Sequence, residues 1–472
     1  MSFVFFDTET TGLSHGFDQI VHFAAIRTDT NLDEIDRFQA RSCLLPHVVP
    51  HPSALCTNGL PISRLLDTAL PPHYHMIRDV RDKLLAWSPS IFVGFNSIRF
   101  DEEMMRHALF QNLYPAYLTS KHGNSRSDVL GLVMAAATLS PTCLSVPRGP
   151  EGRPVYRLEG LAAANGLGHA SAHDAMSDAS ATLDLCRLVR DRSSELWQRF
   201  VRFSKKATVA EFVDSEDGFF LTEFFANEPY HAPVICLGRE PGQPNGRLCL
   251  RLDGDLDRLI RMSDDALRFE LSLKPSPVRR LRVNAAPILT PLYDAPDLML
   301  NGADPGTIEA DARALRGDAA LCARIIAAYS SGRAPFPRPP NVEGRLYHDG
   351  FPSPDDEYRM AAFHDASWPD ALSIVQTFDD ERLRTFGLRL IYFGNRSVLP
   401  PAVRMEVERS LTNRLVDEAA GGLTLARALQ ETDLVSANGR LDNQVLLADY
   451  RTYLTDRLSR VAQFRSSHLG IV

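Results

Sequence analysis

The sequence predicts an α/β domain followed by an α+β region and a mainly helical C-terminal region. Up to about residue 190, apolar strand-like runs alternate with stretches of helical periodicity, which is typical of a mixed α/β domain. A Pro-rich stretch at 332–340 then separates a strand-rich segment from one dominated by helical periodicity. With 472 residues, 44% of them hydrophobic, the chain is long enough for more than one core.

Four segments of the first region have the composition of strands, and the second and third predict a hairpin: residues 3–6, 20–28, 34–43 and 90–96. The Pro- and Gly-containing segment 141–154 is expected to be an exposed loop. A long helix is expected to begin near Asp174 and to run toward Phe203, because apolar residues recur there at helical spacing.

The middle region predicts strands at 234–237, 248–252 and 281–289, the first two as a hairpin, and helices at 264–271 and 307–329. The Pro-rich stretch 332–340 cannot continue a helix and is interpreted as a linker. Beyond it, helical periodicity recurs at 361–363, 381–393, 401–418, 424–431 and 443–463. We therefore expect three domains, at 1–200, 201–342 and 343–472.

Two carboxylates follow the first apolar strand. Asp7 and Glu9 are two residues apart, so in a strand they project from the same face. Close carboxylates repel each other and lose hydration, a cost that a divalent cation such as Mg²⁺ or Mn²⁺ would offset. The alternative is a strand that ends in an ordinary polar turn, because a motif this short often occurs without function.

Three further residues are candidates for the same site as Asp7 and Glu9: Asp101, His173 and Asp178. Asp101 lies where a strand gives way to a helical stretch, so its ordinary role would be a helix N-cap worth about 1 kcal/mol. His173 precedes a helix in which Asp178 lies one turn inside, with Asp174 as the expected cap. The order Asp-x-Glu, Asp, then His-x4-Asp favours one nuclease site over three unrelated structural features.

On these motifs the chain resembles the DEDDh 3′→5′ exonuclease superfamily, and it is similar in particular to the bacterial exonuclease I family. The narrower resemblance rests on residues 23–29, 124–126, 157–159, 172–178, 335–336, 341–342 and 346–347. The similarity covers essentially the whole chain. It implies a ribonuclease H-like nuclease domain, an SH3-like α+β domain and a C-terminal helical domain.

The resemblance also implies single-stranded DNA as substrate and two Mg²⁺ ions per site, with Mn²⁺ able to substitute. Asp7 would bridge both ions, Glu9 and Asp178 would complete the shell of one, and Asp101 would hold the other. His173 would take the proton from the attacking water. The products would be nucleoside 5′-monophosphates, and the implied setting is DNA repair and recombination.

The expected substrate contacts are Glu9, Arg157, Arg99, Lys121 and Arg126, with Arg157 first among the basic residues. Base stacking could involve Phe100, Tyr114 or Tyr117, although Phe100 is expected to pack in the core. Residues 54–60 fall where the superfamily places a wedge around the terminal base. The usual Thr-Gly pair is interrupted there by Asn58.

Composition limits the kind of DNA binding, the state of the cysteines and the cellular location that we expect. The formal net charge of −8 argues against non-specific coating of duplex DNA but leaves room for a locally basic cleft. The seven cysteines form no C-x-x-C motif and are expected to be reduced thiols. Because neither a signal peptide nor a membrane-spanning run is found, we expect a cytoplasmic bacterial protein, monomeric by default.

The sequence leaves two alternative functions and one binding partner open. The chain could be an RNA-trimming relative, or a catalytically silent scaffold that binds nucleic acid. The acidic C-terminal tail of single-stranded DNA-binding protein could dock on it, as the family resemblance implies. Ser140 stands where that family would have a basic residue, so no pocket for the tail is assigned.

Overall fold

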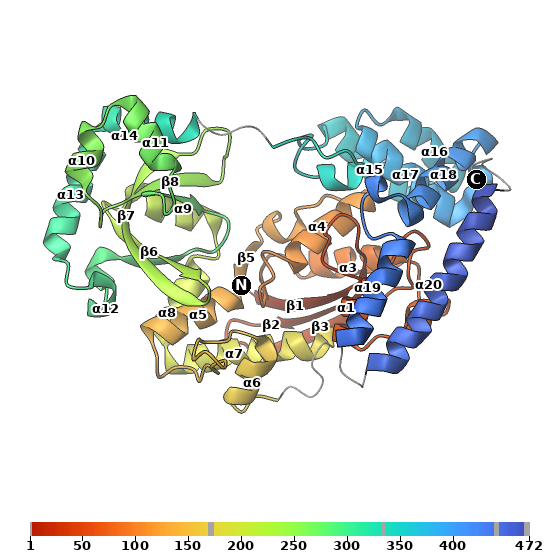
Figure 1. Ribbon diagram of the computed structural model, residues 1–472, viewed down its shortest axis with the longest axis horizontal. Coiled ribbons are helices and arrows are strands. Elements are labelled where there is room, and N and C mark those ends of the chain that lie inside the picture. Colours follow the sequence, from red (N-terminus) through yellow and green to blue (C-terminus); the bar gives the residue numbers. More distant parts are fainter. Residues whose placement is uncertain (1, 169–173, 332–335, 439–442, 467–472) are drawn as a thin grey trace.

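The computed structural model describes residues 2–168, 174–331, 336–438 and 443–466. It forms three parts, shown in Figure 1: a central α/β part, an α+β part on the left and a helical part on the right. The predicted fold class is confirmed. We propose the divisions 1–200, 201–342 and 343–472 as the three domains, called here the nuclease, middle and C-terminal domains.

The nuclease domain is built on a five-stranded sheet in the order β3-β2-β1-β4-β5. Its strands are β1 (Ser2–Thr10), β2 (Ile20–Thr28), β3 (Glu34–Arg41), β4 (Ser90–Gly94) and β5 (Ser125–Asp128). The first three are antiparallel, which confirms the predicted hairpin, and β4 and β5 run parallel to β1. The sheet therefore has β1 at its centre.

Strand β1 is apolar on both faces because helices cover both. Phe3 and Phe5 pack in one core cluster, while Val4 and Phe6 pack in another on the opposite face. The helices of this domain are α1 (Pro52–Asn58), α2 (Ile62–Leu65), α3 (His73–Ala86), α4 (Asp101–Gln111), α5 (Val129–Leu139), α6 (Leu158–Ala164), α7 (Ala175–Arg192) and α8 (Ser194–Arg202).

Two predictions for this domain need correction. The helix after Asp174 does not reach Phe203, because α7 ends at Arg192 and the non-helical backbone of Ser193 separates it from α8. The loop 141–154 is mostly exposed, but Cys143 and Leu144 are buried in the core cluster beneath it.

The middle domain holds an antiparallel sheet in the order β10-β6-β7-β8-β9. Its strands are β6 (Phe219–Phe225), β7 (Glu228–Arg239), β8 (Gly246–Arg251), β9 (Val278–Arg282) and β10 (Ile288–Pro291). Its helices are α9 (Lys206–Ser215), α10 (Leu256–Arg261), α11 (Asp264–Ser272), α12 (Asp297–Leu300), α13 (Pro305–Gly317) and α14 (Ala319–Ser330).

The predicted hairpin is confirmed in β7 and β8, but the single strand predicted at 281–289 is wrong. That segment contributes to β9 and β10, which lie at opposite edges of the sheet. The helix predicted at 307–329 is two helices, since Asp318 ends α13 and its side chain caps α14.

The C-terminal domain is helical, as predicted. It contains α15 (Pro354–Asp365), α16 (Trp368–Thr377), α17 (Glu381–Asn395), α18 (Pro401–Val416), α19 (Leu425–Asn438) and α20 (Gln444–Phe464). Of the expected linker, residues 332–335 lie outside the described residues and 336–339 have no regular structure.

The C-terminal domain shares cores with the nuclease domain. Leu55 of α1 and Leu65 of α2 belong to the same cluster as Leu425 of α19 and Tyr450 of α20, and Figure 1 shows α1, α19 and α20 side by side. This packing matters because α1 forms one wall of the candidate site. Among the described residues, no helix has the length and apolar composition needed to cross a membrane.

Candidate nuclease site

A pocket of about 850 Å³ opens at the end of β1, where the nuclease and C-terminal domains meet. It is lined by the end of β1 and the loop after it, by α1, by residues before α4, and by Gly422 and Leu423 of the C-terminal domain. All four carboxylates predicted from the sequence line it: Asp7, Glu9, Asp101 and Asp178. The structure therefore brings together residues that lie up to 171 positions apart.

Asp7, Glu9 and Asp178 form the centre of the pocket. Each offers a carboxylate oxygen, and these oxygens all lie within 4.8 Å of one another. Asp7 and Glu9 come from β1, and Asp178 lies in the first turn of α7, which packs along that strand. Asp7 and Glu9 project from the same face of β1 because side chains alternate along a strand. Asp178 reaches them because α7 packs against that strand.

Asp101 is held beside this group by Thr8. Its carboxylate accepts a hydrogen bond of 3.0 Å from the Thr8 backbone N–H and one of 2.5 Å from the Thr8 hydroxyl. The N-cap interpretation of Asp101 is wrong, because Phe100 occupies the cap position and Asp101 is the first residue of α4. Thr8 was not singled out from the sequence, although its place between Asp7 and Glu9 could have indicated it.

The carboxylates of the pocket are crowded, and their pKa values show it. Burial, with repulsion from Asp101 and Asp178, raises the pKa of Asp7 well above its usual range. Burial and the charge of Asp178 raise the pKa of Glu9 to about 8. Burial raises the pKa of Asp101 to about 7, although its hydrogen bonds with Thr8 oppose the shift.

This crowding fits a divalent cation. A cation among the carboxylates would remove their mutual repulsion and replace the water they lose on burial. The ligand atoms are all oxygens, the type that Mg²⁺ and Mn²⁺ prefer. The residues of this structure are therefore suited to the metal site that the sequence predicts.

The predicted general base, His173, lies outside the described residues. Asp174, the next residue, is the N-cap of α7 as expected, and its side chain accepts a hydrogen bond from the Ser177 backbone N–H. Arg41 forms an ion pair of 3.1 Å with Asp174. The chain thus enters α7 at a fixed point one turn before Asp178.

The basic residues expected to contact substrate differ in their surroundings. Arg99 and Arg157 are exposed, Arg99 directly before the pocket residue Phe100. Lys121 is half-exposed and lies 3.8 Å from Glu357. Arg126 is buried, where it pairs with Glu102 at 3.3 Å and donates to the carbonyl of Asn284. We do not retain Arg126 as a substrate contact, because its guanidinium joins the nuclease and middle domains.

Part of the pocket lining was predicted from the sequence, namely the wedge segment 54–60 and the aromatic residue Phe100. Ala54, Thr57 and Asn58 line the pocket, and the Asn58 side chain donates to the Thr10 carbonyl at 3.1 Å. Phe100 packs against a core cluster, as expected, and it also lines the pocket. Gly422 and Leu423 were missed, because only the three-dimensional fold brings them to the pocket.

Known proteins resemble this chain in sequence and in structure. A family model described as Exonuclease matches residues 4–186, the part that carries all five predicted catalytic positions. Exodeoxyribonuclease I of Escherichia coli is 27% identical over 410 residues, which cover 81% of this chain and 83% of that protein. Exodeoxyribonuclease I of Buchnera aphidicola subsp. Acyrthosiphon pisum is 31% identical over 303 residues, 62% of this chain and 72% of that protein.

Solved structures agree over the whole fold. An exonuclease I from Methylocaldum szegediense superposes with a TM-score of 0.83 at 26% identity, covering 97% of this chain and 99% of that one. E. coli exonuclease I in complex with a dA16 oligonucleotide gives the same TM-score and coverage at 24% identity. The family predicted from the sequence is confirmed, and the chain belongs to the exodeoxyribonuclease I family.

Proposed function

We propose that this protein is a 3′→5′ exonuclease specific for single-stranded DNA, which releases nucleoside 5′-monophosphates. The observation that carries the proposal is the group of four carboxylates in one pocket, in a chain of the exodeoxyribonuclease I family. E. coli exonuclease I, whose fold this chain shares, has been crystallised with dA16 and dT13 oligonucleotides.

Asp7, Glu9 and Asp178 would hold one Mg²⁺ ion, and Asp7 and Asp101 a second, with Mn²⁺ able to substitute. When bound, such ions would polarise the scissile phosphate and stabilise the negative charge that builds up on it. Thr8 keeps the Asp101 carboxylate turned toward β1 through its two hydrogen bonds.

His173 is proposed to accept the proton of the attacking water, because imidazole titrates near neutral pH. Its place in the chain, directly before the cap of α7, brings it close to Asp178 in sequence. Arg99 and Arg157 are proposed to contact the DNA backbone, since both are exposed. Docking of the acidic tail of single-stranded DNA-binding protein stays a prediction without an assigned pocket, and so does the monomeric state.

The test is an incubation with Mg²⁺ and 5′-labelled single-stranded DNA beside four controls: the matching duplex, the RNA version, a 3′-blocked strand and a reaction with EDTA. We expect shortening of the unblocked DNA single strand alone, abolished by EDTA. Preferential cleavage of RNA would assign the protein to an RNA-trimming activity. A folded protein that cleaves none of these substrates would overturn the proposal in favour of a silent scaffold.

A further inference from the structure

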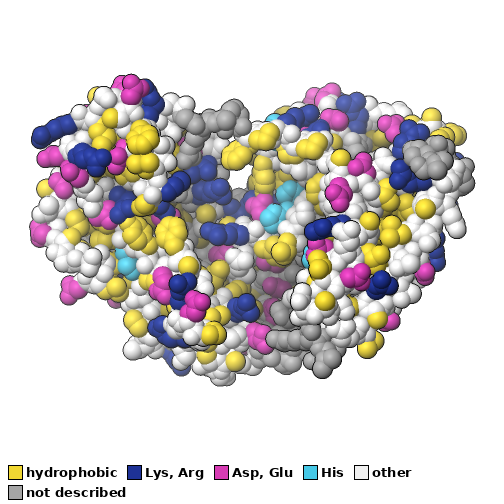
Figure 2. Space-filling model, viewed as in Figure 1, with side chains coloured by type: hydrophobic (Ala, Val, Ile, Leu, Met, Phe, Trp, Pro, Cys, Tyr) yellow, Lys and Arg dark blue, Asp and Glu magenta, His cyan; other side chains and the backbone are white. Residues whose placement is uncertain are grey.

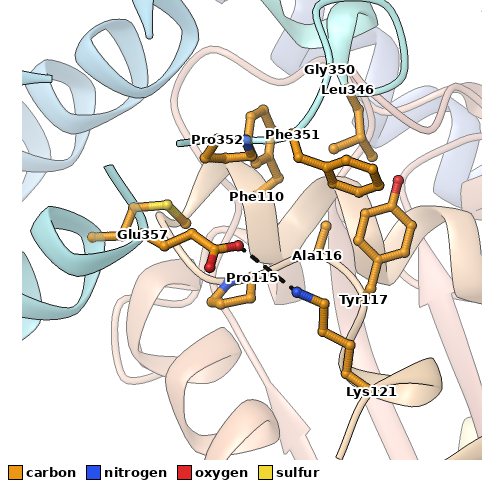
Figure 3. A pocket seen from close by; sticks show the side chains of 11 residues that line it. Phe110, Pro115, Ala116, Tyr117, Lys121, Leu346, Gly350, Phe351, Pro352 and Glu357 are labelled. Atoms are coloured by element: carbon orange, nitrogen blue, oxygen red, sulfur yellow. Dashed lines mark ion pairs between the residues drawn. The ribbon is translucent and has the colours of Figure 1, made fainter. Parts of the chain in front are cut away.

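A small pocket lies where α4 meets the start of the C-terminal domain, and Figure 3 shows it from close by. Its lining is mostly apolar, and its two charged side chains, Lys121 and Glu357, pair with each other at 3.8 Å. Neither charge is therefore left to select a ligand. Reactive side chains come together instead in the middle domain, on strands β7 and β8.

Cys236 of β7 and Cys249 of β8 lie directly opposite each other in the antiparallel pair. Further along the same ladder the Leu252 backbone N–H donates to the Pro233 carbonyl at 2.8 Å, which marks a hydrogen-bonded pair. Bonded and non-bonded pairs alternate, so Cys236 and Cys249 form a non-hydrogen-bonded pair. In such a pair the Cα atoms are about 4.5 Å apart. This separation is within the range of roughly 4.4–6.8 Å that a disulfide spans.

The two thiols are in contact through a hydrogen bond. This bond lowers the pKa of Cys236 and raises that of Cys249, so the Cys249 thiol donates and the Cys236 sulfur accepts. The charge of Arg247 adds to the lowering of the Cys236 pKa and that of Asp214, 3.9 Å from the Cys236 sulfur, opposes it. A lowered pKa increases the fraction of thiolate, the form of cysteine that attacks an oxidant.

Cys236 differs from the other cysteines of the chain, all seven of which lie among the described residues. It is the only one whose pKa is lowered, whereas burial raises the pKa of Cys43 and Cys56, which are half-buried like Cys236. Cys249 is fully buried. An oxidant from solvent therefore reaches Cys236 first and leaves its sulfur within reach of Cys249.

The thiol pair is not built as a metal site. A structural Zn²⁺ ion takes four ligands in a tetrahedral arrangement. In the part of the chain that the structure describes, Asp7, Glu9 and Asp178 are the only group of three or more His, Cys, Asp or Glu side chains whose ligand atoms all lie within 4.8 Å of one another. Cys236 and Cys249 are therefore better suited to oxidation than to metal binding.

We propose that Cys236 and Cys249 form a reversible oxidation site, at which a peroxide converts the two thiols into a disulfide between β7 and β8. The Cys236 thiolate attacks one oxygen of hydrogen peroxide, the O–O bond breaks and hydroxide leaves, which gives a sulfenic acid on Cys236. The Cys249 sulfur then attacks the Cys236 sulfur and displaces its hydroxyl group, which leaves as water with the Cys249 proton. Two electrons pass from the sulfurs to the peroxide, and a dithiol reverses the change by thiol–disulfide exchange.

The disulfide would close a loop of residues 237–248, which contains the turn between β7 and β8. A closed loop restricts the unfolded chain, so the oxidised protein should unfold at a higher temperature than the reduced protein. Figure 2 shows the hollow between the middle and C-terminal domains, and the residues that line the catalytic pocket come from the nuclease and C-terminal domains. The oxidation site is thus separate from the catalytic carboxylates and does not depend on the proposed nuclease function.

The test treats the full chain with hydrogen peroxide and then blocks the remaining thiols with N-ethylmaleimide. Trypsin can separate the two cysteines into different peptides, because Arg239 and Arg247 lie between them, and mass spectrometry without reduction identifies any cross-linked peptide. We expect a Cys236–Cys249 cross-link, a loss of two of the seven blocked thiols, and recovery of both after dithiothreitol. The unfolding temperature should rise on oxidation and return on reduction.

Cys249→Ala should stop at the sulfenic acid on Cys236, which dimedone traps, and Cys236→Ala should leave Cys249 unoxidised. Cys43→Ala is the matched control, because it removes another half-buried thiol and should still form the cross-link. Far-ultraviolet circular dichroism checks that each variant is folded, and the wild-type peptides decide the question even where a variant is not. A wild type that loses no thiols, or that oxidises Cys43 as fast as Cys236 without forming the cross-link, would overturn the proposal.

Discussion

Gly16, in the loop that follows β1, lies directly against Glu343 of the C-terminal domain. A Cβ atom on Gly16 would lie 2.7 Å from the Glu343 backbone oxygen, which is closer than real Cβ contacts. The same loop receives a hydrogen bond of 2.8 Å from Gln111 to the Gly16 carbonyl. The C-terminal domain therefore fixes the conformation of a loop that lines the catalytic pocket.

Gly16→Ala should separate this loop from the C-terminal domain. The added methyl group must displace backbone, so we expect a loss of about 1–3 kcal/mol in the free energy of unfolding and a lower rate of hydrolysis even on short oligonucleotides. Gly317→Ala is the matched control, since a Cβ at the end of α13 would enter open space. Unchanged stability and rate in Gly16→Ala would argue against the contact.

Asp178→Asn should be folded but inactive. The substitution removes a ligand from the carboxylate group, and a loss of about 10²- to 10⁴-fold in single-turnover rate is expected. In EDTA the variant should unfold at a higher temperature than the wild type, because the charge of Asp178 raises the pKa of both Asp7 and Glu9 in the crowded pocket. Asp184→Asn, on the same helix and paired with Arg187 at 2.9 Å, should keep the activity.

Mg²⁺ alone, without DNA, should stabilise the fold. A cation that binds only the folded carboxylate group adds about 2.7 kcal/mol at a concentration 100 times its dissociation constant. Differential scanning calorimetry should show a rise in unfolding temperature that EDTA reverses. Asp184→Asn should show the same rise and Asp178→Asn a smaller one; identical shifts in both variants would place the cation elsewhere.

Stability should fall between pH 7 and pH 5, in part because of His73. This side chain is buried against Ser42, and burial lowers the pKa of His73 to about 4. Over this interval the unfolded chain binds a proton that the folded chain does not, so acidification costs roughly 2 kcal/mol from this one group.

His73→Gln should reduce the slope of unfolding free energy against pH, measured by urea denaturation at both pH values. His75→Gln, at an exposed position two residues further along α3, provides the comparison. If the two variants have the same slope, His73 is not the group responsible.

Local patterns predicted the catalytic carboxylates because each of them lies near the end or the beginning of a regular element. The apolar run before Asp7 requires a buried strand, and the periodicity after Asp178 requires a helix with a buried face, so both side chains could be placed by geometry. Their convergence at one pocket followed from the order of the motifs. The middle strand β6 was missed, although Phe219–Phe225 is rich in aromatic residues.

Features that depend on distant partners could not be predicted. Nothing near Arg126 in the sequence indicates that its guanidinium pairs with Glu102 and donates a hydrogen bond to the Asn284 carbonyl. The break between α7 and α8 at Ser193 could not be predicted either, because apolar periodicity continues on both sides of it. Gly422 reaches the pocket only because α18 and α19 fold back over the nuclease domain.

The hydrogen bond from Tyr450 to the Pro50 carbonyl spans 400 residues of sequence and supports the wall of the pocket next to α1. Ribosomes extend a chain by about 5–20 residues per second, so about 20–80 s separate the synthesis of its two ends. During that time the nuclease domain lacks the helices that complete its core. A nascent nuclease domain thus exposes the apolar faces of α1 and α2 until translation is almost finished, because their core partners on α19 and α20 are made last.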